Sequence, residues 1–148
     1  MFAPKKILVP TDFTRESDRA LSEAVDIAKA FRSKVLLIHV DRRIQEVGVD
    51  MALSPELVKE LSEQDTEAAR AKMRAQVRRI ALESDVVVQM AERHGTTHEE
   101  ILRYAQENEV DLIVLDPHAK KGLLKTLLRG GVTDKVAHKA LCPVLILH

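Results

Sequence analysis

The segment from residue 116 to residue 132 combines residue types that can bind or repel an anion. It ends on Gly130, Gly131 and Val132, where the apolar pattern predicts that a helix begins. The first backbone N–H groups of a helix have no partner within it, and the helix dipole places partial positive charge there. Four basic residues precede Gly130: Lys120, Lys121, Lys125 and Arg129. The helix start favours an anion such as phosphate, and the basic residues have two interpretations that both stay open: they contact phosphate, or they are ordinary solvated charge.

The beginning of the same segment opposes phosphate binding. An ionised Asp116 would repel phosphate unless a metal ion or a lysine intervenes. Asp116 is either a metal-assisted phosphate contact or a turn residue before Pro117. Ala119 carries a Cβ, which hinders close approach of a phosphate and disfavours positive φ. His118 is interpreted as a solvated loop histidine. We therefore expect phosphate to bind more weakly here than at a loop without the Asp116 charge and the Ala119 side chain.

A second polar group, made of Pro10, Thr11 and Asp12, directly follows the first apolar run. In sheets of parallel strands, ligands bind at the carboxyl ends of the strands. Asp12 therefore has two interpretations, which both stay open: it contacts a ligand, or it caps the loop before the first helix.

Other reactive side chains give no catalytic or metal signature. The six histidines (His39, His94, His98, His118, His138 and His148) lack the spacing and acid partner of a known zinc motif. The single cysteine, Cys142, excludes a disulfide within the chain and is interpreted as an inert core thiol. One cysteine suits a reducing compartment, so we expect a cytoplasmic protein.

The composition excludes several classes of protein. Basic and acidic residues both number 23, and this balance argues against a nucleic-acid-binding protein. No apolar run approaches the roughly 20 residues that span a bilayer, so no membrane association is expected. The length of 148 residues predicts a single domain over 1–148.

Short apolar runs alternate with helical patterns along the chain. The runs are mostly continuous, as in strands buried on both faces, and are 7–9, 35–40, 86–88, 112–115 and 144–147. Helices are expected from Thr14 to about Phe31, from Pro55 with Ser54 as its cap to about residue 82, from a capping box at 97–100, and from Gly130-Gly131. A loop is expected at 41–50. This order predicts an α/β fold, a three-layer sandwich around a five-stranded parallel sheet.

The chain resembles the universal stress protein family over nearly its whole length. Five stretches resemble the family's strands and third helix in order and spacing: 7–14, 37–40, 99–102, 111–114 and 142–146. The resemblance implies a flavodoxin-like sheet of order 3-2-1-4-5, similar to that of adenine nucleotide hydrolases. It also implies homodimers paired through the last strand, and some members of the family bind ATP.

The resemblance also implies roles for particular residues. Asp12 occupies the family's position near the base and ribose, and the backbone of Val40 the position near the adenine edge. ATP binders carry glycine, two residues, glycine, nine residues, then glycine and a hydroxyl residue after the fourth strand. Here Asp116 and Ala119 replace the first two glycines, ten residues precede Gly130, and Gly131 replaces the hydroxyl residue. The triphosphate half of the site is therefore expected to be damaged.

Two functions remain open. The first is a stress-response homodimer that acts by binding, with weak or absent nucleotide affinity. The second is an ATP-binding switch, with magnesium and at most slow hydrolysis. A receiver domain, a dinucleotide-binding enzyme and a Ser hydrolase lack their required residues here. The apolar last strand predicts an antiparallel dimer through Val144, Leu145, Ile146 and Leu147.

Overall fold

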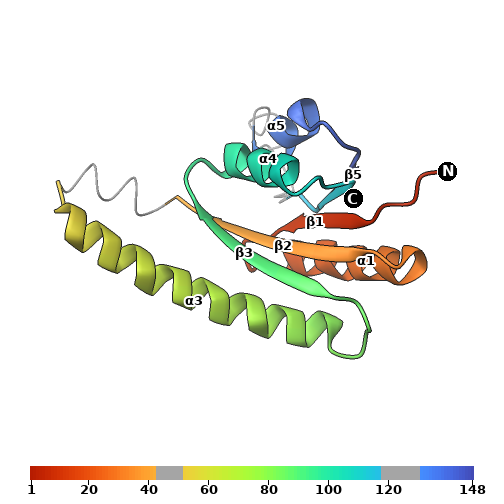
Figure 1. Ribbon diagram of the computed structural model, residues 1–148, viewed down its shortest axis with the longest axis horizontal. Coiled ribbons are helices and arrows are strands. Elements are labelled where there is room, and N and C mark those ends of the chain that lie inside the picture. Colours follow the sequence, from red (N-terminus) through yellow and green to blue (C-terminus); the bar gives the residue numbers. More distant parts are fainter. Residues whose placement is uncertain (43–51, 118–130) are drawn as a thin grey trace.

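A computed structural model describes residues 1–42, 52–117 and 131–148 of the chain. Its strands are β1 (Lys6–Pro10), β2 (Lys34–Asp41), β3 (Val88–His94), β4 (Leu112–Leu115) and β5 (Val144–Ile146). Its helices are α1 (Arg15–Phe31), α3 (Pro55–Ala81), α4 (Thr97–Glu107) and α5 (Val132–Lys139). All strand pairs are parallel, in the order β3-β2-β1-β4-β5 (Figure 1). The α/β class and the predicted strand order are confirmed.

The sheet is the middle layer of three. Helices α1 and α3 cover one face, and α4 and α5 cover the other (Figure 1). Successive residues of a strand point to opposite faces. Ile7 and Val9 accordingly join the cluster with Leu21 of α1, whereas Leu8 joins the cluster with Ile101 of α4. These side chains are all fully buried, which explains why β1 reads as a continuous apolar run.

Two helix starts form as their cap residues predict. The Thr14 hydroxyl accepts from the Ser17 N–H at 3.4 Å at the start of α1. The Ser54 hydroxyl accepts from the Leu57 N–H at 3.2 Å, and Pro55 follows at the first helical position. Such caps satisfy backbone N–H groups that have no partner inside the helix.

Two local predictions are wrong. The third strand was expected at residues 86–88 but begins at Val88, and Val87 is 60% exposed. β3 is an edge strand with polar side chains, so its apolar pattern is weaker than that of the central strands. The expected capping box from Thr97 does not form, because the N-cap of α4 is Thr96 and makes no side-chain cap. Most of the loop expected at 41–50 lies outside the described residues.

No helix in the described ranges is both long enough and apolar enough to pass through a lipid bilayer.

We expect Leu8→Ala to lower the free energy of unfolding by about 2–5 kcal/mol, because it leaves a cavity in the central strand. Leu8 is 0% exposed. The matched control is Leu82→Ala, since Leu82 is 72% exposed, and it should change that free energy by less than about 0.5 kcal/mol. Urea titration followed by circular dichroism measures both. Equal effects would contradict this account of the core.

Candidate functional site

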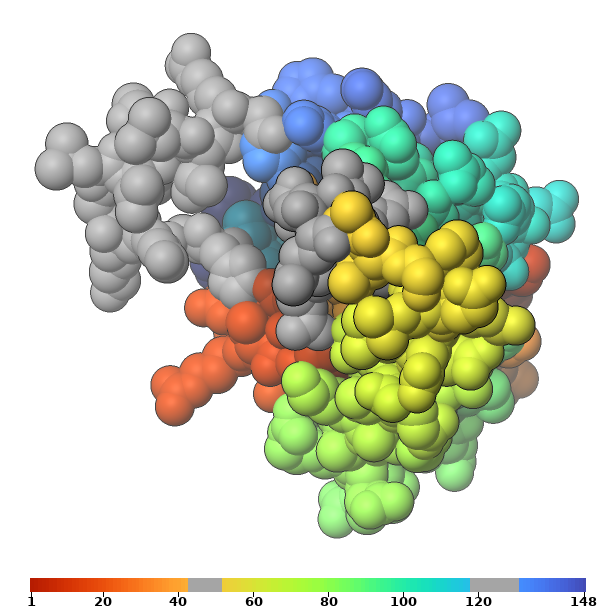
Figure 2. All heavy atoms as spheres, turned by 90° about the vertical axis from the view of Figure 1, so that its left-hand side faces the viewer, coloured from red at the N-terminus to blue at the C-terminus, as the bar shows by residue number. Residues whose placement is uncertain are grey.

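The carboxyl ends of β1, β2 and β4 bring most of the predicted site residues to one edge of the sheet. β1 pairs with β2 in the register Pro10↔Ile38 and with β4 in the register Leu8↔Ile113. Extending these registers places Asp12 level with Val40, and Thr11 level with Asp116. Figure 2 looks onto this edge, with the first residues of α1, the start of α3 and α5 around it.

Thr11 is a buried structural residue of this edge. Its hydroxyl donates to Gln76 Oε1 at 2.9 Å, lies 3.1 Å from Ser17 Oγ, and accepts from the Phe13 N–H at 3.1 Å. Its backbone N–H donates to the Ile38 carbonyl at 2.8 Å. The whole residue is 6% exposed, and its hydroxyl faces residues of α1 and α3. The Thr11 hydroxyl is therefore committed to internal hydrogen bonds and does not face a ligand.

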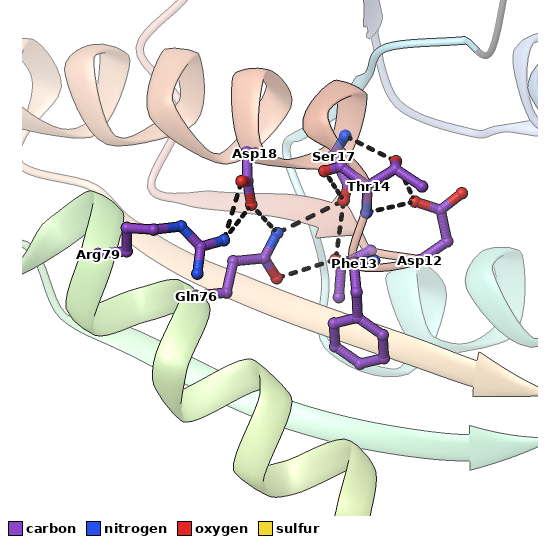
Figure 3. A network of polar contacts seen from close by, with 8 residues as sticks. Asp12, Phe13, Thr14, Ser17, Asp18, Gln76 and Arg79 are labelled. Carbon is purple, nitrogen blue, oxygen red and sulfur yellow. Dashed lines mark hydrogen bonds and ion pairs between the residues drawn. The ribbon is translucent and has the colours of Figure 1, made fainter.

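Asp12 caps the turn that leads into α1. Its Oδ1 accepts from the Thr14 N–H at 3.2 Å and from the Thr14 hydroxyl at 2.5 Å (Figure 3). This is the loop-capping role that the sequence left open. The residue is nevertheless exposed at the carboxyl end of the sheet. Contact between Asp12 and a ligand stays a prediction.

The loop from Pro10 to Thr14, called the ligand loop below, contains an unusual backbone conformation. Phe13 has φ +66° without being glycine. A left-handed conformation costs a residue with a side chain on the order of 1 kcal/mol, so its surroundings must hold it. The Phe13 ring lies 4.6 Å from the His39 ring, and His39 Nδ1 lies 2.9 Å from the Thr11 carbonyl oxygen. The sequence did not indicate this support.

The backbone of Val40 lies beyond the end of β1, and its contact with an adenine stays a prediction. The Ile38 carbonyl accepts from Thr11 N and so faces β1. Backbone direction repeats every two residues along a strand, so the backbone groups of Val40 point the same way. β1 ends at Pro10, before it reaches the level of Val40. Val40 therefore directs its backbone beyond the end of β1, toward the ligand loop.

Asp116 is held by an ion pair that the sequence did not reveal. Its side chain is 4% exposed, and its Oδ2 lies 3.2 Å from Arg19 Nε on α1. The same oxygen has no hydrogen-bond partner among the described residues, so the contact is electrostatic without hydrogen-bond geometry. Arg19 Nη2 also donates to the His148 carbonyl at 3.1 Å. The Asp116 side chain is thus buried and paired with Arg19, and its contact with a phosphate stays a prediction.

The end of β4 and the start of α5 meet in one groove of about 410 Å³, which contains Pro117, Gly131, Val132 and Ile146. Gly131 is the N-cap of α5 and, as a glycine, has no side chain with which to cap it. The predicted helix start is therefore confirmed, and within the described residues its N-cap residue leaves the first backbone N–H groups without a side-chain partner. Three other predicted site residues, His118, Ala119 and Gly130, lie outside the described residues, as do the basic residues between them.

A second polar cluster lies at the carboxyl end of β3. His94 Nε2 is 3.0 Å from Thr66 Oγ1 and 3.3 Å from Ser62 Oγ, both on α3. A serine beside a histidine suggests a nucleophile and its base, but the base then needs an acid to orient it. His94 Nδ1 is buried and has no partner in the part of the chain that is described. The arrangement ties α3 to β3 and does not form a triad.

Metal and thiol chemistry receive little support from the described ranges. They hold no group of three or more His, Cys, Asp or Glu side chains that could bind a metal ion. Burial raises the pKa of the Cys142 thiol above its ordinary value, which lowers the fraction of reactive thiolate at neutral pH. The second-largest influence, a backbone hydrogen bond, lowers this pKa but does not outweigh burial.

Comparison with known proteins assigns the class of protein. The model of the universal stress protein family matches residues 4–148. Universal stress protein MJ0531 of Methanocaldococcus jannaschii is 35% identical over 97% of this chain and 81% of its own. Universal stress protein MJ0577 of the same organism is 31% identical over 97% of this chain and 94% of its own.

Solved structures agree with this assignment. That of MJ0577 has a TM-score of 0.77 at 32% identity, covering 99% of this chain and 96% of its own. Universal stress protein UspA from Lactobacillus plantarum has a TM-score of 0.72 at 30% identity, covering 97% of each chain. The chain belongs to the universal stress protein family.

Proposed function

We propose that this stress-response protein binds an adenine nucleotide with few phosphates at the edge formed by β1, β2 and β4, and acts as a homodimer. Affinity for ATP is weak or absent. The observation that carries the proposal is the buried Asp116 carboxylate, which lies where family members that bind ATP have a glycine. The proposal includes a cytoplasmic location, which the single cysteine favours.

The adenosine half of the site supports nucleotide binding. The ligand loop is held on both sides, and the backbone of Val40 points past the end of β1. Two structures of the same fold were solved with nucleotides: a universal stress protein in complex with cAMP, 22% identical, and one from Archaeoglobus fulgidus in complex with dAMP, 16% identical. Both ligands carry a single phosphate group, which is the class of ligand proposed here.

The part of the site between Asp116 and the start of α5 limits how many phosphate groups the bound nucleotide can carry. The start of α5 can bind one anionic group through its first backbone N–H groups, for which the N-cap Gly131 supplies no side-chain partner. A triphosphate would extend toward Asp116, and the Asp116 carboxylate occupies space that a glycine would leave open. Asp116 already faces Arg19, so it does not present a free carboxylate to the magnesium ion that accompanies ATP. A second or third phosphate group therefore weakens binding, because its repulsion by Asp116 outweighs the contacts that it makes.

The alternative, an ATP-binding switch with slow hydrolysis, rests on Arg19. Its guanidinium neutralises Asp116 and thereby reduces the repulsion of phosphate that the sequence predicted. Arg19 is 57% exposed at its side chain and could turn toward a phosphate. In this case Asp116 would be displaced from Arg19 when ATP binds.

The edge strand β5 supports the homodimer. β5 pairs with β4 on one side and ends the order of the described sheet on the other. Val144, Leu145 and Ile146 are all half-buried apolar residues. An uncovered apolar edge with free backbone groups favours pairing with a second copy.

Isothermal titration with AMP, cAMP and ATP with magnesium tests the proposed function. We expect AMP or cAMP to bind at least about ten-fold more tightly than ATP, a difference of roughly 1.4 kcal/mol. Stoichiometric ATP binding at submicromolar concentration would favour the switch instead. Native mass spectrometry of the gently desalted protein provides an independent check, because it identifies a nucleotide that co-purifies.

A further inference from the structure

Gln76 is an uncharged residue buried within the strongly charged helix α3. It is 1% exposed, although much of this helix faces solvent. A buried amide is tolerated only when its hydrogen bonds are satisfied. Gln76 reaches across to α1 and to the ligand loop, both far from it in the sequence (Figure 3).

The orientation of the Gln76 amide follows from its neighbours. The Asp18 carboxylate faces Arg79 Nη2, 2.8 Å from each oxygen, and an ionised carboxylate can only accept hydrogen bonds. The Gln76 atom that lies 2.8 Å from Asp18 Oδ1 must therefore be the donor Nε2. Gln76 Oε1 consequently faces the Thr11 hydroxyl and accepts from it at 2.9 Å.

This orientation determines the role of the Thr11 hydroxyl. A hydroxyl has one proton, and two acceptors lie within reach of the Thr11 hydroxyl: Gln76 Oε1 at 2.9 Å and Ser17 Oγ at 3.1 Å. The shorter distance favours Gln76 Oε1. The oxygen then presents its lone pairs to the Phe13 N–H, which donates to it at 3.1 Å. Phe13 is the residue with φ +66°, so this hydrogen bond supports a conformation that non-glycine residues disfavour. A chain of hydrogen bonds thus runs from Asp18 through Gln76 and Thr11 to Phe13.

We infer that Gln76 is a positioning residue for the ligand loop. Its amide holds the Thr11 hydroxyl in the rotamer that supports Phe13, and Asp12 lies between these two residues. Gln76 thereby sets the direction in which Asp12 and the loop backbone face a nucleotide, without touching the nucleotide itself. The effect on affinity depends on the proposed nucleotide function, whereas the effect on the loop does not.

The test compares Gln76→Met with Arg79→Met. Methionine has nearly the shape of glutamine but cannot hold the Thr11 hydroxyl. Arg79 contacts the opposite end of the network through Asp18 and does not contact Thr11, so Arg79→Met is the matched control. Amide hydrogen exchange measured by NMR should be about ten-fold faster at Phe13 in Gln76→Met, relative to the amide of Ile113 in the core. In Arg79→Met it should change less than about two-fold.

Exchange that rises equally in both variants, or that rises at Phe13 and Ile113 alike, would show that Gln76 is merely structural and overturn the inference. AMP titration of the same variants should show affinity about five-fold to ten-fold lower for Gln76→Met only. If no form binds a nucleotide, the proposed function fails, and the exchange comparison still decides the role of Gln76. If Gln76→Met does not fold, Gln76→Leu replaces it. This variant must accelerate exchange at Phe13 to the same extent, and unchanged exchange would overturn the inference.

Discussion

Replacing Asp116 by glycine is expected to strengthen ATP binding by roughly ten-fold or more. Two unit charges about 5 Å apart interact by roughly 3 kcal/mol at the effective dielectric constant typical of a protein surface. Arg19 offsets part of this repulsion in the wild-type protein, because its Nε lies 3.2 Å from Asp116 Oδ2. The substitution removes the acid, opens space for a phosphate and releases the guanidinium of Arg19 to bind it. Isothermal titration with ATP and magnesium measures the change.

A second substitution separates charge from space at this position. Asp116→Asn removes the charge but retains nearly the same volume. Asparagine should therefore recover only the electrostatic part of the gain, and glycine the whole of it. Arg19→Met should have the opposite effect and weaken ATP binding, since it leaves the Asp116 carboxylate without its partner. An unchanged affinity for ATP in Asp116→Gly would refute the proposal that this carboxylate limits the site.

Replacing Ile146 by proline is expected to weaken dimerisation by about 100-fold, because proline has no N–H to donate. The Leu147 N–H donates to the Leu115 carbonyl at 2.9 Å and so faces β4. Because direction alternates along a strand, the Ile146 N–H faces the opposite, outer edge. Proline is tolerated in an edge strand where the missing N–H faces outward. Analytical ultracentrifugation at tens of micromolar should show a species near 16.6 kDa.

The matched control for the edge is Ile146→Val, which keeps the N–H and a similar apolar side chain. It should remain a dimer under the same conditions. The proline variant itself should stay folded and lose no more than about 1 kcal/mol in the free energy of unfolding. A proline variant that still forms dimers would rule out pairing through β5 and direct attention to another surface.

The fold could be predicted because its signals are local. Continuous apolar runs mark the central strands, and Thr14 and Ser54 each cap a helix in the structure as their positions indicate. The third strand was predicted at the wrong residues because its local signal is weak. Its edge position leaves it partly exposed, so the apolar pattern that marks buried strands ends where the strand begins.

The candidate site could be predicted only in outline. The carboxyl ends of parallel strands meet at one edge, so Thr11, Asp12 and Asp116 were expected together, and the family resemblance implied Val40 beside them. The surroundings of these side chains were not predicted. Thr11 was a candidate ligand contact, yet its hydroxyl is bonded to Gln76, 65 positions away. Asp12 was ambiguous, and one of its oxygens caps the loop.

The sequence by itself determined the succession of strands and helices along the chain, the α/β class and the edge of the sheet at which the candidate site was expected. These follow from apolar periodicity, cap residues and the handedness of parallel crossovers, which act over short stretches of chain. The tertiary structure alone decided that Arg19 neutralises Asp116 and that Gln76 holds Thr11. Such pairs join residues distant in the chain, and only the packing of α1 and α3 against the sheet brings them within hydrogen-bond or ion-pair distance.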